Sequence, residues 1–102
     1  MRQFGVYANP ERRSRFQIPF VIVLQSDHVH DTRGVVVAPL VDAETMKEQR
    51  LYPVIRVEGR RLAVVVTEIA AAPRKLLKER VGNEALHRDR IVAALDLLLT
   101  GV

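Results

Sequence analysis

Hydrophobic and polar residues alternate along much of the first two thirds of the chain, as they do in β-strands with one buried face. We expect strands over residues 3–8, 16–25, 35–41, 51–57 and 61–69. Three aromatic residues fall on positions that should face the core: Phe4, Phe16 and Phe20. The pattern therefore predicts a β barrel of short strands, in a fold of the mainly β, α+β class.

Glycine and proline positions refine this prediction. Gly59 lies in a three-residue loop between two expected strands, which predicts a hairpin over residues 58–60. Residues 31–34 predict a turn before the third strand. Pro19 cannot donate a ladder hydrogen bond, so we expect it at a sheet edge or a bulge. The apolar run 64–66 has no polar face, which predicts a central strand.

The last third of the chain has helical spacing. Pro73 and Gly82 bracket a short predicted helix over residues 74–81, because proline suits the first position of a helix and glycine the residue after its end. Asn83 can cap a longer helix over residues 84–99. A helical wheel gives that helix one broad apolar face, made of Ile91, Val92, Ala94, Leu95, Leu98 and Leu99.

A second apolar patch lies beyond a polar stripe on the same helix. The stripe consists of Asp89, Asp96 and Thr100, and the patch consists of Leu86, Ala93 and Leu97. One core rarely buries both patches, so the second should meet a partner. We expect a homodimer whose interface includes Leu97 and Ala93.

Length and composition limit the organisation of the protein. Its 102 residues allow one core, so we expect a single domain over residues 1–102. It has no cysteine, which excludes a disulfide framework and any thiolate metal site. No signal peptide is visible at the start, and the longest apolar run, 35–41, is far shorter than a membrane span. We expect a cytoplasmic protein without membrane contact.

The charge balance points to an acidic partner. Sixteen basic and twelve acidic residues give a formal net charge of +4. Arginines gather at residues 12–15, at Arg60 and Arg61, and at Arg88 and Arg90. Such clusters are often solvated turns and strand ends, but they also suit an acidic protein tail or nucleic acid.

One short segment could carry chemistry. In an extended chain His28 and His30 would share a face, and Asp27 or Asp31 could complete a two-histidine, one-carboxylate metal site. The segment precedes a turn and has no third histidine nearby, so we predict no metal there. The same histidines with Arg33 could also serve acid–base cleavage of RNA.

Other signatures of catalysis are missing. The chain has no glycine-rich phosphate loop, no nucleophile elbow and no zinc-binding His-Glu-x-x-His helix. Aromatic residues make up only 5% of the chain, too few to provide stacking platforms for bases. We therefore expect a protein that binds other proteins, uses no cofactor and is not an enzyme.

The chain resembles the CcdB family of toxins from ccd toxin–antitoxin modules through a series of short motifs that match in order and spacing from Gln3 to the C-terminus. The motifs are Gln3-Phe4-x-Val6-Tyr7, Ser14-Arg15-Phe16, Gln25-Ser26-Asp27, Asp31-Thr32-x-Gly34, Pro39-Leu40, Leu51-Tyr52-Pro53-Val54, Thr67-Glu68-x-Ala70, Pro73, His87-Arg88 and Gly101-Val102. Each is weak alone, but the combination is specific.

The resemblance implies a fold, an activity and partners. The fold would be an SH3-like antiparallel barrel with a C-terminal helix, in a homodimer with the two helices near the twofold axis. The toxin would bind the GyrA subunit of DNA gyrase and trap the gyrase–DNA cleavage complex. A CcdA-like antitoxin would neutralise it with an acidic tail, and the two proteins together would bind operator DNA and repress their operon.

The resemblance also implies site residues. In the family a tryptophan, a glycine and a terminal isoleucine contact gyrase, and Thr100, Gly101 and Val102 occupy these places here. The residues expected to bind gyrase are His28, Val29, Asp96, Leu99, Thr100, Gly101 and Val102. Antitoxin binding is expected at Arg12, Arg13 and Arg15.

Two other functions remain open from the sequence. Ribonuclease toxins such as MazF have the same type of barrel, and Arg15, His28 and His30 would then be the catalytic candidates. A homologue that has lost its target would bind only antitoxin and operator.

Overall fold

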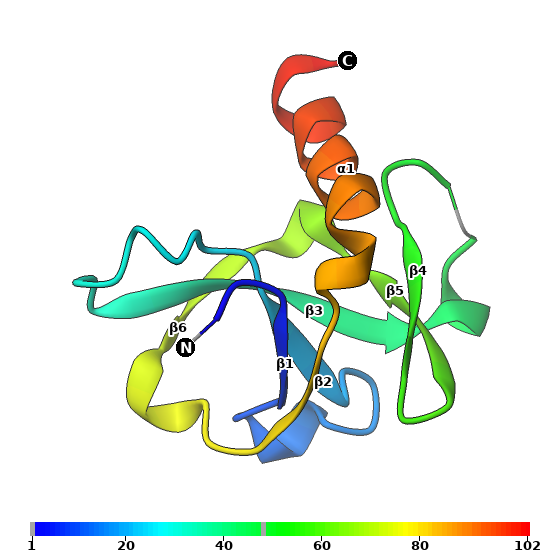
Figure 1. The fold of residues 1–102 in the computed structure, drawn as a ribbon. Coiled ribbons are helices and arrows are strands. Elements are labelled where there is room, and N and C mark those ends of the chain that lie inside the picture. Colours follow the sequence, from blue (N-terminus) through cyan, green and yellow to red (C-terminus); the bar gives the residue numbers. More distant parts are fainter. Residues whose placement is uncertain (1, 48) are drawn as a thin grey trace.

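In a computed structural model, which describes residues 2–47 and 49–102, seven antiparallel strands form a curved half-barrel that one C-terminal helix covers (Figure 1). The strands are β1 Gly5–Ala8, β2 Phe20–Val23, β3 Gly34–Asp42, β4 Val54–Val57, β5 Arg60–Val64, β6 Ala70–Pro73 and β7 Arg80–Asn83. The helix is α1 Arg88–Thr100. The predicted fold class, a mainly β barrel with a C-terminal helix, is confirmed.

The long strand β3 organises the sheet. The order of strands is β4-β5-β3-β2-β1-β7, with β6 also paired to β3. The end of β3 pairs with β5, through Leu40 and Val64, and its start pairs with β6, through Gly34 and Pro73. Strands β5 and β6 are joined by the short 3-10 helix η3, Val66–Glu68. The predicted strand over residues 61–69 is therefore correct only as far as Val64, because its last part forms η3 and the next strand, β6, begins at Ala70.

Burial on both faces explains the apolar runs. The main core lies between the sheet and α1 and contains Phe4, Val6, Phe20, Ile22, Leu24, Ala38, Leu40, Ile55, Val57, Leu62, Val64, Val66, Ile91 and Ala94. A smaller cluster on the opposite face contains Tyr7, Val21, Val23, Val35, Val37, Ala72 and Leu77. Val64, Val65 and Val66 are all buried, and β5 lies between β4 and β3 as predicted for this run.

The predicted strand over residues 16–25 is wrong in its first half. The chain forms a 3-10 helix, η1 Arg12–Ser14, and the Ser14 carbonyl then accepts hydrogen bonds from the backbone N–H groups of Gln17 and Ile18. Strand β2 begins only at Phe20. Phe16 is consequently 83% exposed, so its assignment to the core is also wrong, whereas Phe4 and Phe20 are buried as predicted.

The predicted helix over residues 74–81 is also wrong. Residues Arg74–Leu76 form one 3-10 turn, η4, and the chain continues into β7. This strand pairs with β1, opposite Val6, so Gly82 lies in a strand and does not end a helix. The open edge of β1 offers backbone hydrogen bonds that outweigh the local helix signals.

The predicted C-terminal helix is confirmed in most of its length but begins later. A 3-10 turn, η5 Ala85–His87, precedes α1, and the side chain of Asn83 accepts a hydrogen bond from the backbone N–H of Ala85, at 2.9 Å. This hydrogen bond forms a turn that leads into η5, and Asn83 is not the N-cap of α1 as predicted, because Glu84 precedes η5 and His87 precedes α1. Within the described residues, no helix is long and apolar enough to cross a membrane.

Candidate protein-binding surfaces

The C-terminal half of α1 projects beyond the barrel (Figure 1). Ile91 and Ala94 are fully buried and fix the start of the helix on the sheet. Further along, exposure rises to 38% at Leu98, 73% at Leu99 and 80% at Val102. Exposed leucine and valine side chains at a projecting end favour contact with another macromolecule.

Local hydrogen bonds define this end, which we call the helix tip (Asp96, Leu99, Thr100, Gly101 and Val102). Gly101 adopts the left-handed conformation, with φ of 79°, and its N–H donates to the Leu97 carbonyl at 3.0 Å. The Thr100 hydroxyl donates to the Asp96 carbonyl at 2.7 Å. The Thr100 hydroxyl proton is therefore already used inside the helix, which leaves its methyl group and the apolar neighbours for contacts.

The histidine loop, residues 25–33, holds the other residues expected to contact gyrase. His28 and Val29 are exposed, and the Gln25 side-chain amide braces the loop by donating to the Val29 carbonyl at 2.6 Å. In Figure 1 the loop lies to one side of the barrel, whereas the helix tip stands above it. Among the described residues, no hydrogen bond or ion pair joins the loop to the tip.

The structure separates the residues of the suggested ribonuclease site. The Arg15 guanidinium donates from Nε to the Asn9 carbonyl at 2.6 Å and lies 3.9 Å from the Glu79 carboxylate. His30 lies in the histidine loop, where its Nδ1 is 3.4 Å from an Asp31 carboxylate oxygen in an exposed pair. Acid–base catalysis needs groups that converge on one atom, and Arg15 lines a different hollow from His30.

A metal site at the histidine pair would also need a third ligand. In the part of the chain that the structure describes, no three His, Cys, Asp or Glu residues gather closely enough to hold a metal ion. The absence of a metal at His28 and His30 stays a prediction.

The arginine turn, residues 11–15, borders an apolar groove. Arg12 and Arg13 are exposed, and neither forms an ion pair within the described residues. Arg12 and Arg15 line a hollow of about 180 Å³ together with Lys78. Next to it lies a groove of about 470 Å³ whose wall is formed by Asn9, Pro10, Glu11, Val21, Val37, Ala70, Ala72, Pro73 and Leu76.

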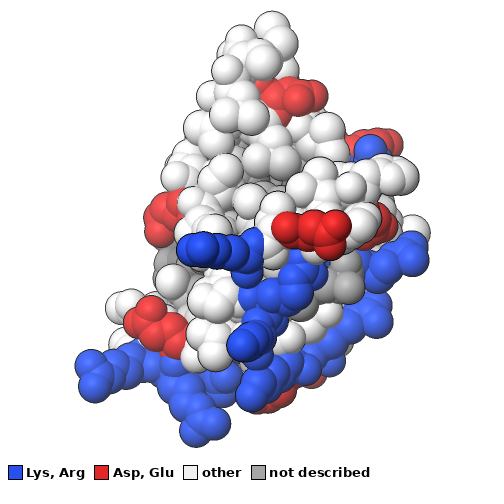
Figure 2. Space-filling model, turned by 90° about the vertical axis from the view of Figure 1, so that its left-hand side faces the viewer, with Lys and Arg blue, Asp and Glu red and all other residues white. Residues whose placement is uncertain are grey.

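Charge divides the surface into two regions. Figure 2 shows Lys and Arg side chains gathered on the lower part of one face, over the barrel, while the projecting helix above it is largely white. An acidic partner would be attracted to the barrel, and an apolar partner to the helix.

The second apolar patch of the helix is less continuous than the sequence suggested. Leu86 is 97% exposed, but it lies in η5 and outside α1. Ala93 is exposed and Leu97 is half-buried. The helical wheel assumed that the α-helix began at residue 84, which misplaced Leu86 relative to the other two.

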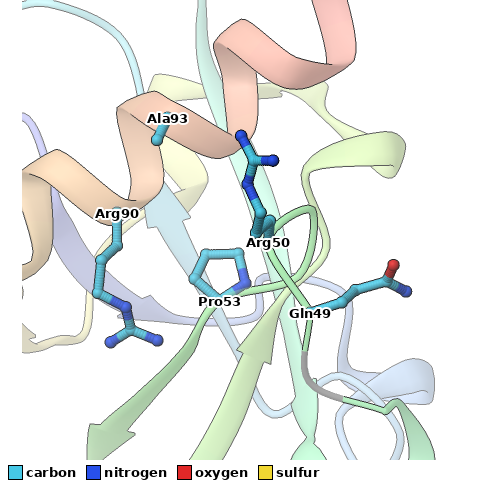
Figure 3. Close-up of a pocket in the computed structure, with 5 residues that line it drawn as sticks. All are labelled: Gln49, Arg50, Pro53, Arg90 and Ala93. Carbon is cyan, nitrogen blue, oxygen red and sulfur yellow. The ribbon is translucent and has the colours of Figure 1, made fainter. Parts of the chain in front are cut away.

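The sequence analysis missed a cavity lined by arginines between α1 and β4. Gln49, Arg50, Pro53, Arg90 and Ala93 surround a hollow of about 300 Å³ (Figure 3). A second hollow of about 290 Å³ adjoins it, lined by Val54, Ile55, Arg56, Arg61, His87 and Arg90. The sequence feature that could have indicated this cavity is the hairpin around Gly59, because it places Arg56 directly opposite Arg61.

Comparison with known families identifies the chain. The family model described as CcdB protein matches residues 3–101, almost the entire chain. The chain belongs to the CcdB family and is therefore a toxin of a toxin–antitoxin module.

Proposed function

We propose that this toxin inhibits DNA gyrase by binding the GyrA subunit with its helix tip and trapping the gyrase–DNA cleavage complex. The observation that carries the proposal is the exposure of Leu99 and Val102 at the projecting end of α1. These side chains can pack against an apolar surface of the target without any change in the barrel. The toxin then acts by binding and not by catalysis.

The helix tip exposes apolar side chains for contact but contains no large aromatic side chain. The left-handed Gly101 turns the last residue away from the helix axis, so that Leu99 and Val102 can contact the target together. An aromatic anchor is commonly worth about 2 kcal/mol or more in an interface, whereas the methyl group of Thr100 offers much less apolar area. We expect a weaker contact with gyrase than a tryptophan at this position would give.

The arginine turn is the proposed site for the CcdA-like antitoxin. Arg12 and Arg13 can pair with carboxylates of an acidic tail, and the apolar groove beside them can receive apolar side chains of the same segment. Arg15 is held by Asn9 and Glu79, so it orders the turn in addition to contributing charge. The toxin–antitoxin complex would then bind operator DNA.

The experiment compares gyrase binding of wild type and Thr100→Trp. A purified GyrA fragment is titrated with each protein, and DNA cleavage by gyrase is measured in parallel. We expect Thr100→Trp to bind about thirtyfold more tightly, the factor that corresponds to about 2 kcal/mol, and to trap more cleaved DNA.

One control variant and one contradicting outcome accompany this comparison. Arg12→Gln with Arg13→Gln should weaken binding of an acidic antitoxin peptide and leave gyrase binding unchanged, because the arginine turn is remote from the tip. Wild type that binds GyrA at nanomolar concentration, with no effect of Thr100→Trp, would show that the tip is not the contact.

A further inference from the structure

Residues 74–80, from the end of β6 to the start of β7, form a strongly basic stretch of the chain, which we call the basic segment. It carries Arg74, Lys75, Lys78 and Arg80 against one acidic residue, Glu79. Figure 1 shows it in yellow at the outer edge of the barrel, on the side away from the β4–β5 hairpin. The fold therefore places a local excess of positive charge at one edge of the molecule.

A buried leucine fixes the basic segment on the barrel. Leu77 is 5% exposed, packs in the smaller apolar cluster, and its N–H donates to the Arg74 carbonyl at 3.2 Å. The side chains of Lys75, Lys78 and Arg80 are exposed on either side of this anchor. The segment therefore presents its charges to solvent from a backbone that the core holds in place.

The charges of the basic segment are only partly neutralised by the protein. The Arg74 guanidinium donates to the His30 carbonyl at 3.0 Å, a contact that leaves its positive charge uncompensated. The Glu79 carboxylate lies 3.9 Å from Arg15, so it also serves the arginine turn. Among residues 2–47 and 49–102, no ion pair or side-chain hydrogen bond involves the other three cations of the segment. A partner with several negative charges would neutralise them.

Neighbouring elements extend the positive surface in both directions. Gly34 lies opposite Pro73 in the pairing of β3 with β6, so the exposed Arg33 is brought close to the start of the basic segment. Lys78 lines one hollow with two residues of the arginine turn. Strand β6 carries only alanine and proline side chains, so it adds no acidic group. Figure 2, which shows the left-hand side of Figure 1, has Lys and Arg side chains across the lower part of this face.

This arrangement suits the phosphates of duplex DNA better than it suits a peptide or a single strand. Cations along an extended strip match a polymer that carries a negative charge about every 3.4 Å along each strand. A peptide would need apolar anchors, and within the basic segment Leu76 alone exposes a large apolar side chain. The segment contains no aromatic residue on which an unpaired base could stack.

We propose that the basic segment, together with Arg33, binds the phosphate backbone of duplex DNA without regard to base sequence. Lys75 and Lys78 contact phosphates as exposed point charges, and the arginines at either end contact the neighbouring phosphates. Binding is driven by the release of counterions that these side chains displace from the DNA. The surface belongs to the free toxin and is separate from the helix tip, so the proposal stands independently of gyrase and antitoxin binding.

The test titrates the full-length toxin, without antitoxin or gyrase, into labelled duplex oligonucleotides at several salt concentrations. Four or five phosphate contacts should make the logarithm of the binding constant fall against the logarithm of salt concentration with a slope of about −4. Two duplexes of unrelated sequence should bind equally well. In ¹H–¹⁵N NMR spectra of wild type, the duplex should shift the amide signals of Lys75, Leu77 and Lys78.

Lys75→Gln with Lys78→Gln removes two of the proposed phosphate contacts. The salt slope should become shallower by about 2, and affinity at low salt should fall about tenfold or more. Arg56→Gln with Arg61→Gln is the matched control, because it removes the same charge from the hairpin at the opposite end of the sheet from β7. The control should keep the slope of wild type and change affinity less than about twofold, since salt screens distant charges.

Several outcomes would overturn the proposal. Equal losses in the two double variants would reduce the effect to net charge, and wild type that leaves the duplex free at low salt would exclude the contact. Tighter binding of a single-stranded oligonucleotide, weakened by Phe16→Ala, would assign the surface to unpaired bases. Tighter binding of an acidic peptide at the same amides would assign it to a protein. The wild-type spectra locate the contact even if a variant fails to fold.

Discussion

The carboxyl group of Glu84 lies where the barrel meets the segment that leads into α1. Its side chain is only 16% exposed, and its backbone N–H donates to the Phe4 carbonyl at 2.9 Å. Burial raises the pKa of Glu84, and the positive charge of His87, whose Nε2 is 3.7 Å from the carboxylate, lowers it by a smaller amount. The net effect is an acid that holds its proton more tightly in the folded chain than in the unfolded one.

This shift predicts a pH dependence of stability. Because the folded state raises the Glu84 pKa above its unfolded value, the free energy of unfolding falls as pH rises through the interval between the two values. Glu84→Gln removes this loss, so the stability of the variant relative to wild type should increase from pH 4 to pH 6. Urea denaturation at several pH values measures it. His87→Gln is the control for the ion pair. If the stability of Glu84→Gln relative to wild type stayed constant or fell over this range, the raised pKa of Glu84 would be contradicted.

Single residues show where sequence reasoning succeeds and where it stops. The alternating pattern correctly predicted that the Phe4 ring lies in the core. It did not predict the backbone conformation of Phe4, whose φ is 65° and whose N–H donates to the Val23 carbonyl at 2.7 Å. The exposure of Phe16 could not be predicted from its alternation, because it follows from the Asn9 side chain. That amide donates to Ser14 and to the Ile18 carbonyl, both at 2.9 Å, and folds the segment into a turn.

Among the elements, α1 depends on Gly101 for its ending. An added Cβ at Gly101 would meet no atom within 4 Å, so the cost of a substitution comes from the backbone conformation alone. A residue other than glycine in the left-handed region costs roughly 1 kcal/mol or more. The last turn can avoid this cost by fraying, which would displace Thr100 and Val102 relative to Leu99.

Gly101→Ala should therefore weaken GyrA binding about fivefold, the factor that corresponds to about 1 kcal/mol, while thermal stability changes little. Binding titrations and hydrogen exchange of the last helical amides measure the two effects. Gly82→Ala is a matched control, because Gly82 also has open space around it but lies in a strand without a positive φ. Equal binding by Gly101→Ala and wild type would mean that the ending of α1 does not position the contact.

Elements were predictable where local pattern and tertiary environment agree. Strand β3 and helix α1 follow their apolar spacing closely. The segment 74–83 does not, because pairing of β7 with β1 joins residues more than 70 positions apart in the chain. Local signals at Pro73 and Gly82 contain no information about that distant edge. The cavity between α1 and β4 was missed for the same reason, since a hairpin and a helix far apart in sequence build it together.

At the scale of the whole molecule, the surface assigns different faces to different contacts. Basic side chains gather over the barrel on the face that Figure 2 shows, and Leu98 and Leu99 are exposed on the second half of α1. A domain of this size buries a smaller fraction of its surface than larger domains do, so association adds stability that the single core lacks. A contact along the helices would shield Leu97 and Leu98 while the arginine-rich faces point away from each other.

This arrangement predicts a homodimer that a single charge can disrupt. Leu97 is half-buried on α1, and arginine there would bring two like charges together at the twofold axis. Leu97→Arg should therefore sediment as a monomer at tens of micromolar, whereas wild type sediments as a dimer, and its circular dichroism should show an intact barrel. Leu86→Arg is the matched control, because Leu86 is 97% exposed in η5, outside the proposed contact. Leu86→Arg should remain dimeric. Sedimentation of wild type as a monomer at these concentrations would exclude the dimer, and the exposed leucines of α1 would then be left for gyrase alone.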